Sequence, residues 1–165
     1  MNALFYISAS VAVLSTLMVL TRLNVVHALL YLIVSLLSVA LIFFILGAPF
    51  VAALEVIIYA GAIMVLFVFV IMMLNLGPQA TRHESQWLSP GAWIGPAILS
   101  TILMGEFIYI FAKSCSINTI RSVEPKQVGI ALFGSYLLGV ELASMLLLAG
   151  IVGAYYLGRR DHDYQ

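Results

Sequence analysis

Five long apolar runs divide this chain and leave little room for anything else. They lie at residues 2–20, 25–46, 51–75, 91–112 and 130–157. Each reaches the about 20 residues that a helix needs to cross the hydrocarbon core of a bilayer, which is about 30 Å thick. The connections are too short for a folded domain outside the membrane. The sequence therefore predicts an all-α integral membrane protein with five transmembrane helices and a single membrane domain over residues 1–165.

The composition excludes several classes of function. Of the 165 residues, 64% are hydrophobic and only 8% are charged, so a water-soluble domain of this size would expose large apolar patches. The net charge is zero, which provides no basic surface for nucleic acid, and no phosphate-binding or dinucleotide-binding glycine loop is present. We therefore expect the lipid bilayer as surroundings and no nucleic acid as a partner.

The cysteine and the histidines predict no metal site. Cys115 is the single cysteine, and His27, His83 and His162 lie far apart without the spacing of metal ligands. No internal disulfide can form.

The first run has no basic segment before it and no clear small-residue cleavage site after it, so we expect it to remain in the mature protein as a helix.

The basic residues predict how the chain crosses the membrane. An odd number of helices puts the termini on opposite sides, and lysines and arginines gather in the cytoplasmic loops. One side would carry Arg22, Arg82, Arg159 and Arg160, and the other Lys113, Arg121 and Lys126. We expect a cytoplasmic C-terminus.

Between the second and third runs, Gly47-Ala48-Pro49 predicts a tight hairpin, and Gly77-Pro78 predicts the end of the third helix.

Glu55 lies inside the apolar third run. A carboxylate at membrane depth is costly, so it normally faces protein or a water-filled path and marks a functional site. Helical spacing puts Tyr59 one turn after it, on a face that continues through Ala62, Leu66 and Phe69. A carboxylate partly shielded from water can exchange protons, with the phenol as hydrogen-bonding neighbour. Alternatively, because Glu55 is within two turns of Pro49, it snorkels or caps the helix end.

Gly61 lies between Ala60 and Ala62 on the same predicted helix. Small residues let another helix approach closely, which is their most frequent role in membranes. The second interpretation is a local π-bulge, a distortion that often marks functional sites inside helices.

Two further carboxylates lie within apolar runs. Glu141 is flanked by Gly139 and Ala143 on a face of small residues, so it is a further candidate for a proton path if it is buried between helices. Glu106 is about two turns from Lys113 and the helix end. For Glu106, snorkelling to the headgroups is therefore at least as good an explanation as a proton role.

Several segments resemble one known family. They are NVVHALLY at residues 24–31, ALEVIIYAGAIMVLFVFV at 53–70, MMLN at 72–75 and VELASMLLLAG at 140–150. These residues are similar to subunit J of the bacterial proton-pumping NADH:quinone oxidoreductase, respiratory complex I. The segment at 53–70 is the most specific, because hydropathy alone does not fix its order of Glu, Tyr, Ala-Gly-Ala and Met-Val-Leu.

The resemblance implies a place and a function. The chain would be a multi-pass, membrane-arm subunit in the cytoplasmic (inner) membrane of a bacterium. Its partners would be the quinone-site heel subunit and the small and antiporter-like subunits. It would help to couple electron transfer from NADH to quinone with proton translocation, as a non-catalytic subunit without catalytic residues. It would bind no cofactor, because FMN, iron–sulfur clusters and quinone belong to other subunits of the respiratory complex.

The resemblance also implies site residues. Glu55, with Tyr59, would lie on the family's intramembrane proton path, and the third helix would carry a π-bulge that forms and relaxes. The conformational switch would comprise Tyr59, Ala60, Gly61, Ala62, Met64 and Val65. Two alternatives stay open from the residues themselves. One is a self-contained small ion transporter or channel, and the other is a purely structural helix bundle that scaffolds larger membrane subunits.

Overall fold

The computed structural model describes residues 2–22, 25–73, 90–114 and 122–159. These residues belong to two compact units, Met1–Ser122 and Val123–Gln165, and each unit is described by itself. Five helical segments are long and apolar enough to cross a membrane: Ala3–Thr21, Val25–Ile45, Pro49–Met73, Trp93–Ala112 and Leu137–Gly158. The predictions of an all-α chain and of five membrane-crossing helices are confirmed. The grouping of all five into one membrane domain stays a prediction.

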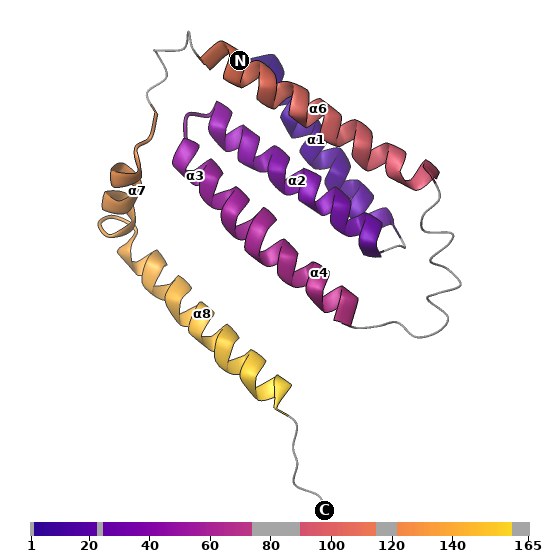
Figure 1. Ribbon diagram of the computed structural model, residues 1–165. Helices are drawn as coiled ribbons and strands as arrows, with labels where there is room; N and C mark the ends of the chain where they lie inside the picture. The colour runs from indigo at the N-terminus through magenta and orange to yellow at the C-terminus, as the bar shows by residue number, and fades with distance from the viewer. Residues whose placement is uncertain (1, 23–24, 74–89, 115–121, 160–165) are drawn as a thin grey trace, which may run out of the picture. The chain divides into compact units, whose positions relative to one another are not determined.

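The first unit is a bundle with α2 in its middle. Its elements are α1 (Asn2–Thr21), α2 (Val25–Ile45), α3 (Pro49–Leu54), η1 (Glu55–Ile63), α4 (Met64–Met73) and α6 (Pro90–Ser114). α3, η1 and α4 follow one another without a break and form one membrane-crossing helix. Figure 1 shows α2 between this joined helix and the pair α1 and α6, and residues of α2 contact all of them.

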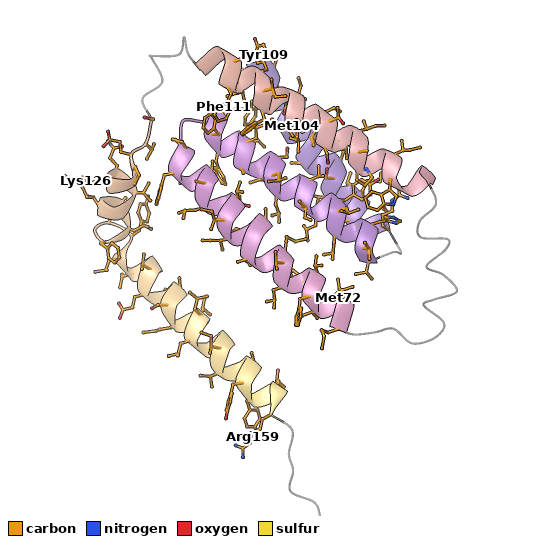
Figure 2. All side chains as sticks on the ribbon, in the orientation of Figure 1. Met72, Met104, Tyr109, Phe111, Lys126 and Arg159 are labelled. Carbon is orange, nitrogen blue, oxygen red and sulfur yellow. The ribbon has the colours of Figure 1, made fainter. Side chains whose placement is uncertain are left out.

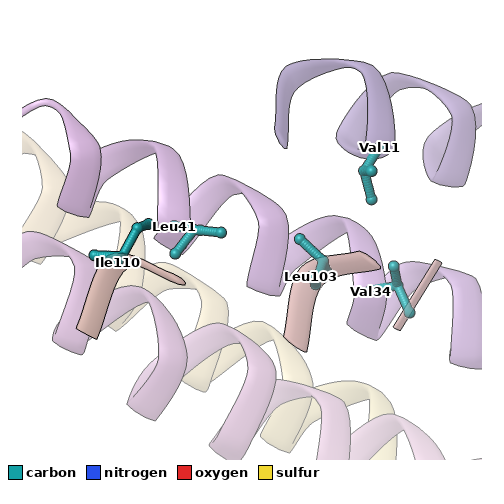
Figure 3. Packing of buried hydrophobic residues seen from close by; sticks show 5 residues of the cluster. All are labelled: Val11, Val34, Leu41, Leu103 and Ile110. Atoms are coloured by element: carbon teal, nitrogen blue, oxygen red, sulfur yellow. The ribbon is translucent and has the colours of Figure 1, made fainter. Parts of the chain in front are cut away.

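The core of the first unit is a small apolar cluster where α1, α2 and α6 meet. It is formed by Val11, Val34, Leu41, Leu103 and Ile110, all of them buried (Figure 3). Most other large apolar side chains of the unit are exposed. This is expected for a bilayer protein, because lipid tails and partner helices are as apolar as a leucine side chain and can cover the outer face.

The predicted hairpin between the second and third runs is present. Gly47 has a φ of 84°, a left-handed conformation that glycine adopts without steric cost. Its N–H donates to the Phe44 carbonyl at 3.1 Å, and the Ala48 N–H donates to the Phe43 carbonyl at 3.0 Å. This pair of bonds is a Schellman motif, which satisfies the last carbonyls of α2. Pro49 then opens α3 at a position where no backbone donor is needed.

A second glycine lets α6 approach α2. A Cβ atom built on Gly95 would collide with the Tyr31 hydroxyl, and Tyr31 is buried. The guanidinium of Arg22 lies 5.6 Å from the centre of the Tyr31 ring, a cation–π distance. Tyr31 therefore packs against both the end of α1 and the backbone of α6.

The second unit contains α7 (Pro125–Leu132) and α8 (Leu137–Gly158). We expected one continuous helix over residues 130–157, and this boundary is wrong because residues 133–136 form a turn. A Cβ at Gly134 would lie 2.7 Å from the Ile130 carbonyl oxygen, so the turn brings the backbone too close for any other residue. The membrane-crossing helix therefore begins at Leu137.

Some predictions fall outside the described residues. They concern the end of the third run at Asn75, the break at Gly77-Pro78, and the residues Arg82, His83, Cys115, Arg121, Arg160 and His162. The predicted cytoplasmic C-terminus depends on several of these residues and stays a prediction.

Candidate functional site

The third membrane-crossing helix changes its hydrogen-bond register around Glu55. Residues Glu55–Ile63 form a π-helical stretch, with α-helix on both sides. At its end the Met64 N–H points to the carbonyl of Tyr59, five residues back. The predicted π-bulge in the third helix is confirmed. Glu55 is the first residue of the stretch, and Tyr59 and Gly61 lie inside it.

The π stretch rotates α4 relative to α3. Ala52 and Met64 are both buried, and α3 and α4 both contact α2. In an unbroken α-helix, residues twelve positions apart point about 120° away from each other. One extra residue in a π turn reduces that difference to about 20°. The stretch thus lets both ends of a long helix turn a buried residue toward α2.

Gly61 fits the π stretch because of its size. A Cβ atom there would lie 3.3 Å from the Val56 carbonyl oxygen, five residues back along the same helix. This contact is tight, so the carbonyl would have to move. Gly61 therefore tolerates the π register better than a residue with a side chain.

Glu55 and Tyr59 lie on the outer side of the first unit. The Glu55 side chain is half-buried, and Tyr59 is 48% exposed. Further along the predicted face, Ala62, Leu66 and Phe69 are also exposed. Within the described ranges, no hydrogen bond joins the Glu55 carboxyl group to the Tyr59 hydroxyl.

Glu106 occupies a different setting, which contradicts one of the two explanations left open for it. The side chain is 6% exposed, so it does not snorkel out of the bundle. Its Oε2 accepts a hydrogen bond of 2.8 Å from the Ser8 hydroxyl of α1. Its Oε1 is buried and has no hydrogen-bond partner among the residues that the structure describes. The distance of two turns to Lys113 had suggested the headgroups, but packing against α1 decides the orientation.

Hydroxyl groups line the contact between α1 and α2. The Ser38 hydroxyl donates to the Ser8 carbonyl, and the hydroxyls of Thr16 and Ser35 lie 2.9 Å apart. The Ser15 hydroxyl is buried, and no described residue is its hydrogen-bond partner. Sequence reasoning missed this row because it considered carboxylates alone. The signal was the spacing of Ser8 and Ser15, two turns apart on one face of an apolar helix.

Glu141 lies in α8, in the second unit, where its side chain is exposed. The Ser144 hydroxyl donates to the Glu141 backbone carbonyl at 2.7 Å, and does not bind the carboxyl group. Burial of Glu141 between helices would require a helix from outside its own unit. Its role in a proton path stays a prediction.

An apolar cavity of about 470 Å³ lies between α2, the joined third helix and α6. Ala52 and Val56 line it on one side, and Leu103 and Phe107 on another. Met104 and Phe111, labelled in Figure 2, also line it. Glu55 and Glu106 are chain neighbours of lining residues, although neither carboxyl group faces the cavity. The described residues contain no cluster of three or more possible metal ligands.

Five helices long and apolar enough to cross a membrane, one of them with a π stretch that begins at a carboxylate residue, define a multi-span helical membrane protein. Residues 15–157 match a family model described as NADH-ubiquinone/plastoquinone oxidoreductase chain 6. The chain therefore belongs to this family and, more narrowly, to the subunit J proteins of bacterial complex I. The resemblance seen in the sequence is confirmed.

Three relatives show how far the similarity extends. All three are named NADH-quinone oxidoreductase subunit J. The protein of Pseudomonas aeruginosa is 58% identical over 163 residues, which cover 98% of each chain. That of Escherichia coli is 56% identical over 162 residues, covering 98% of this chain and 88% of the relative. That of Buchnera aphidicola (subspecies Schizaphis graminum) is 52% identical over 161 residues, covering 96% and 98%.

Proposed function

We propose that this chain is a membrane-arm subunit that helps to couple electron transfer from NADH to quinone with proton translocation. The names of its relatives support the proposal that it belongs to such an assembly, because each relative is named as a subunit of an NADH-quinone oxidoreductase. In this proposal the chain has no redox centre and acts in the bacterial inner membrane, with its C-terminus in the cytoplasm. Other membrane subunits, above all the quinone-site and antiporter-like subunits, surround it.

One observation carries the proposal for the site. Glu55, an ionisable residue at membrane depth, opens a π-helical stretch and is only half-buried in its own chain. π stretches are frequent at functional sites, and an intramembrane carboxylate normally belongs to a path for ions or protons. Glu55 then receives and passes on protons, and Tyr59 orients the carboxyl group or a water beside it. Both residues face outward, so the path continues in neighbouring subunits.

The π stretch would serve as the switch. A backbone with two hydrogen-bond registers can rotate Tyr59, Ala60, Ala62, Met64 and Val65 relative to α3 and so make or break a path. Gly61 permits the change because no side chain blocks the Val56 carbonyl.

The decisive experiment replaces Glu55 by Gln in the assembled complex, reconstituted in liposomes. Gln keeps the size and removes the titratable group, so fewer protons should be pumped for each NADH oxidised. Glu55→Asp, which keeps the titratable group, is the matched control and should retain more pumping. Undiminished pumping in assembled Glu55→Gln complex would refute the relay. A loss that only follows the amount of assembled complex would favour a scaffold.

A second experiment tests the switch. A bulky side chain in Gly61→Leu should lower the turnover of NADH-driven quinone reduction more than it lowers the amount of assembled complex. If assembly alone is lost, Gly61 is a packing residue. Ion flux through the purified chain alone, without its partners, would instead indicate a self-contained transporter.

A further inference from the structure

Glu106 is enclosed by the core of the first unit. Leu103 and Ile110, about one turn before and after it on α6, belong to the apolar cluster in Figure 3. Ser8, which contacts its carboxyl group, and Ser38, which contacts Ser8, are both fully buried. The carboxyl group thus lies at a junction of three helices, away from lipid and from water.

The polar contacts of Glu106 do not support a negative charge. An ionised carboxylate has about four acceptor positions, and burying it without donors or a cation is very costly. Within the described part of the chain one donor serves two oxygens, because Ser8 binds Oε2 and no described group binds Oε1. A neutral carboxylic acid needs far less solvation, and one of its oxygens then carries a hydrogen atom.

The charged and ionisable groups described on α1, α2 and α6 do not compensate a negative charge on Glu106, because they lie too far along their helices or point elsewhere. Arg22 is fourteen residues beyond Ser8 on α1, about 21 Å at the helical rise. His27 is eleven residues before Ser38 on α2, about 16 Å. Tyr6 on α1 and Tyr109 on α6 are exposed on the outside of the unit, and Tyr31 packs at Arg22 and Gly95. Ser8 is the group that the structure brings to the carboxyl.

We propose that Glu106 and Ser8 form a second intramembrane proton-binding site in this chain, separate from Glu55, in which Glu106 holds a proton. The ligand is the proton itself, bound as the O–H of a carboxylic acid. Ser8 donates to one oxygen, and its own carbonyl is held by Ser38, so all three helices contribute to the geometry. The site does not rest on the function proposed for Glu55.

The site also has a defined relation to Glu55. Val56 and Phe107, the residues that follow Glu55 and Glu106, line the same apolar cavity from opposite elements. The first unit therefore holds two carboxylate residues next to lining residues of the same cavity. Glu55 is half-buried, and Glu106 is enclosed. Spectroscopic signals from protonated carboxyl groups of this chain must be divided between them.

Infrared spectroscopy of the assembled complex in lipid tests the proposal. The difference spectrum between wild type and Glu106→Gln should show the loss of a carbonyl stretch of a protonated carboxylic acid. That band should move to lower wavenumber in D₂O, and it should remain in Glu55→Gln. Loss of an ionised-carboxylate band in place of the acid band would overturn the proposal.

Ser8→Ala provides an independent arm that keeps Glu106 in place, in case Glu106→Gln does not assemble. Removing the hydrogen bond to the carboxyl group should shift the same acid band to higher wavenumber. Ser10→Ala is the matched control, because the exposed Ser10 hydroxyl binds the Tyr6 carbonyl of its own helix and should leave the band unchanged. An identical acid band in Ser8→Ala and wild type would overturn the proposed site.

Discussion

Glu55 and Glu106 are two carboxylates of one helical unit, and their surroundings are opposite. Glu55 opens a distorted stretch of helix and is half-buried, with the neighbouring Tyr59 exposed on the outside. Glu106 lies in a regular α-helix and is sealed by α1 and α2. An outward carboxylate can exchange protons with a partner, whereas an enclosed one holds its proton and joins helices. The same residue type at membrane depth therefore serves different purposes according to what covers it.

The largest effect should come from a substitution that disturbs the close contact between α6 and α2. Gly95→Ala puts a methyl group where the Tyr31 hydroxyl lies, so either the buried Tyr31 ring or α6 must shift. Overpacking of this kind should lower the stability of the complex by about 3 kcal/mol. The measurement is the temperature at which the purified complex dissociates, which should fall. Adding Tyr31→Phe removes the colliding oxygen and should restore part of the loss. Equal stability of Gly95→Ala and wild type would show that the two helices are not closely packed.

The next effect tests the rotation that the π stretch produces. Met64 is 2% exposed and Val65 is 67% exposed. Met64→Ala should destabilise the complex by about 2 kcal/mol, at the low end for core truncation because lipid solvates an exposed apolar side chain better than water does, so burial gains less. Val65→Ala is the matched control on the outer side. If the two variants dissociate at the same temperature, Met64 is not buried against α2.

A smaller effect is expected at the contact between α1 and α6. Ser8→Ala removes the donor to Glu106, which should cost about 1 kcal/mol, since hydrogen bonds between membrane helices are individually weak. The same thermal measurement applies, with Ser10→Ala again as the control. A loss as large as that of Gly95→Ala would mean that Glu106 carries a charge that Ser8 stabilises.

The smallest effect concerns the backbone of the π-helical stretch Glu55–Ile63. Gly61→Ala should favour the α-helical register by about 0.5 to 1 kcal/mol, because alanine is the better helix former and its Cβ crowds the Val56 carbonyl. A structure of the variant complex should show a shorter π stretch than wild type. An unchanged Glu55–Ile63 stretch would show that surrounding packing, and not Gly61, sets the register.

Sequence reasoning succeeded where a residue is unusual for its position. Glu55 stands out in an apolar run, the order of residues 53–70 is specific to a family, and Gly47 and Pro49 have few alternatives at a turn. It was wrong where the outcome depends on a distant element. For Glu106, the nearness of Lys113 in sequence left snorkelling to the headgroups as one of two explanations, whereas α1 supplies its partner. The break at Gly134 was missed because an apolar run continues through it.

The amino-acid sequence is enough to show that this protein is helical, that it crosses the membrane five times and that it belongs to a family of complex I subunits. These properties depend on the length and polarity of each segment, and in a bilayer each helix satisfies its own backbone hydrogen bonds. The tertiary structure alone decided which face of each helix is covered. That depends on close contacts such as those of Gly95 with Tyr31 and Ser8 with Glu106, because packing between membrane helices follows shape and single polar groups rather than hydrophobicity.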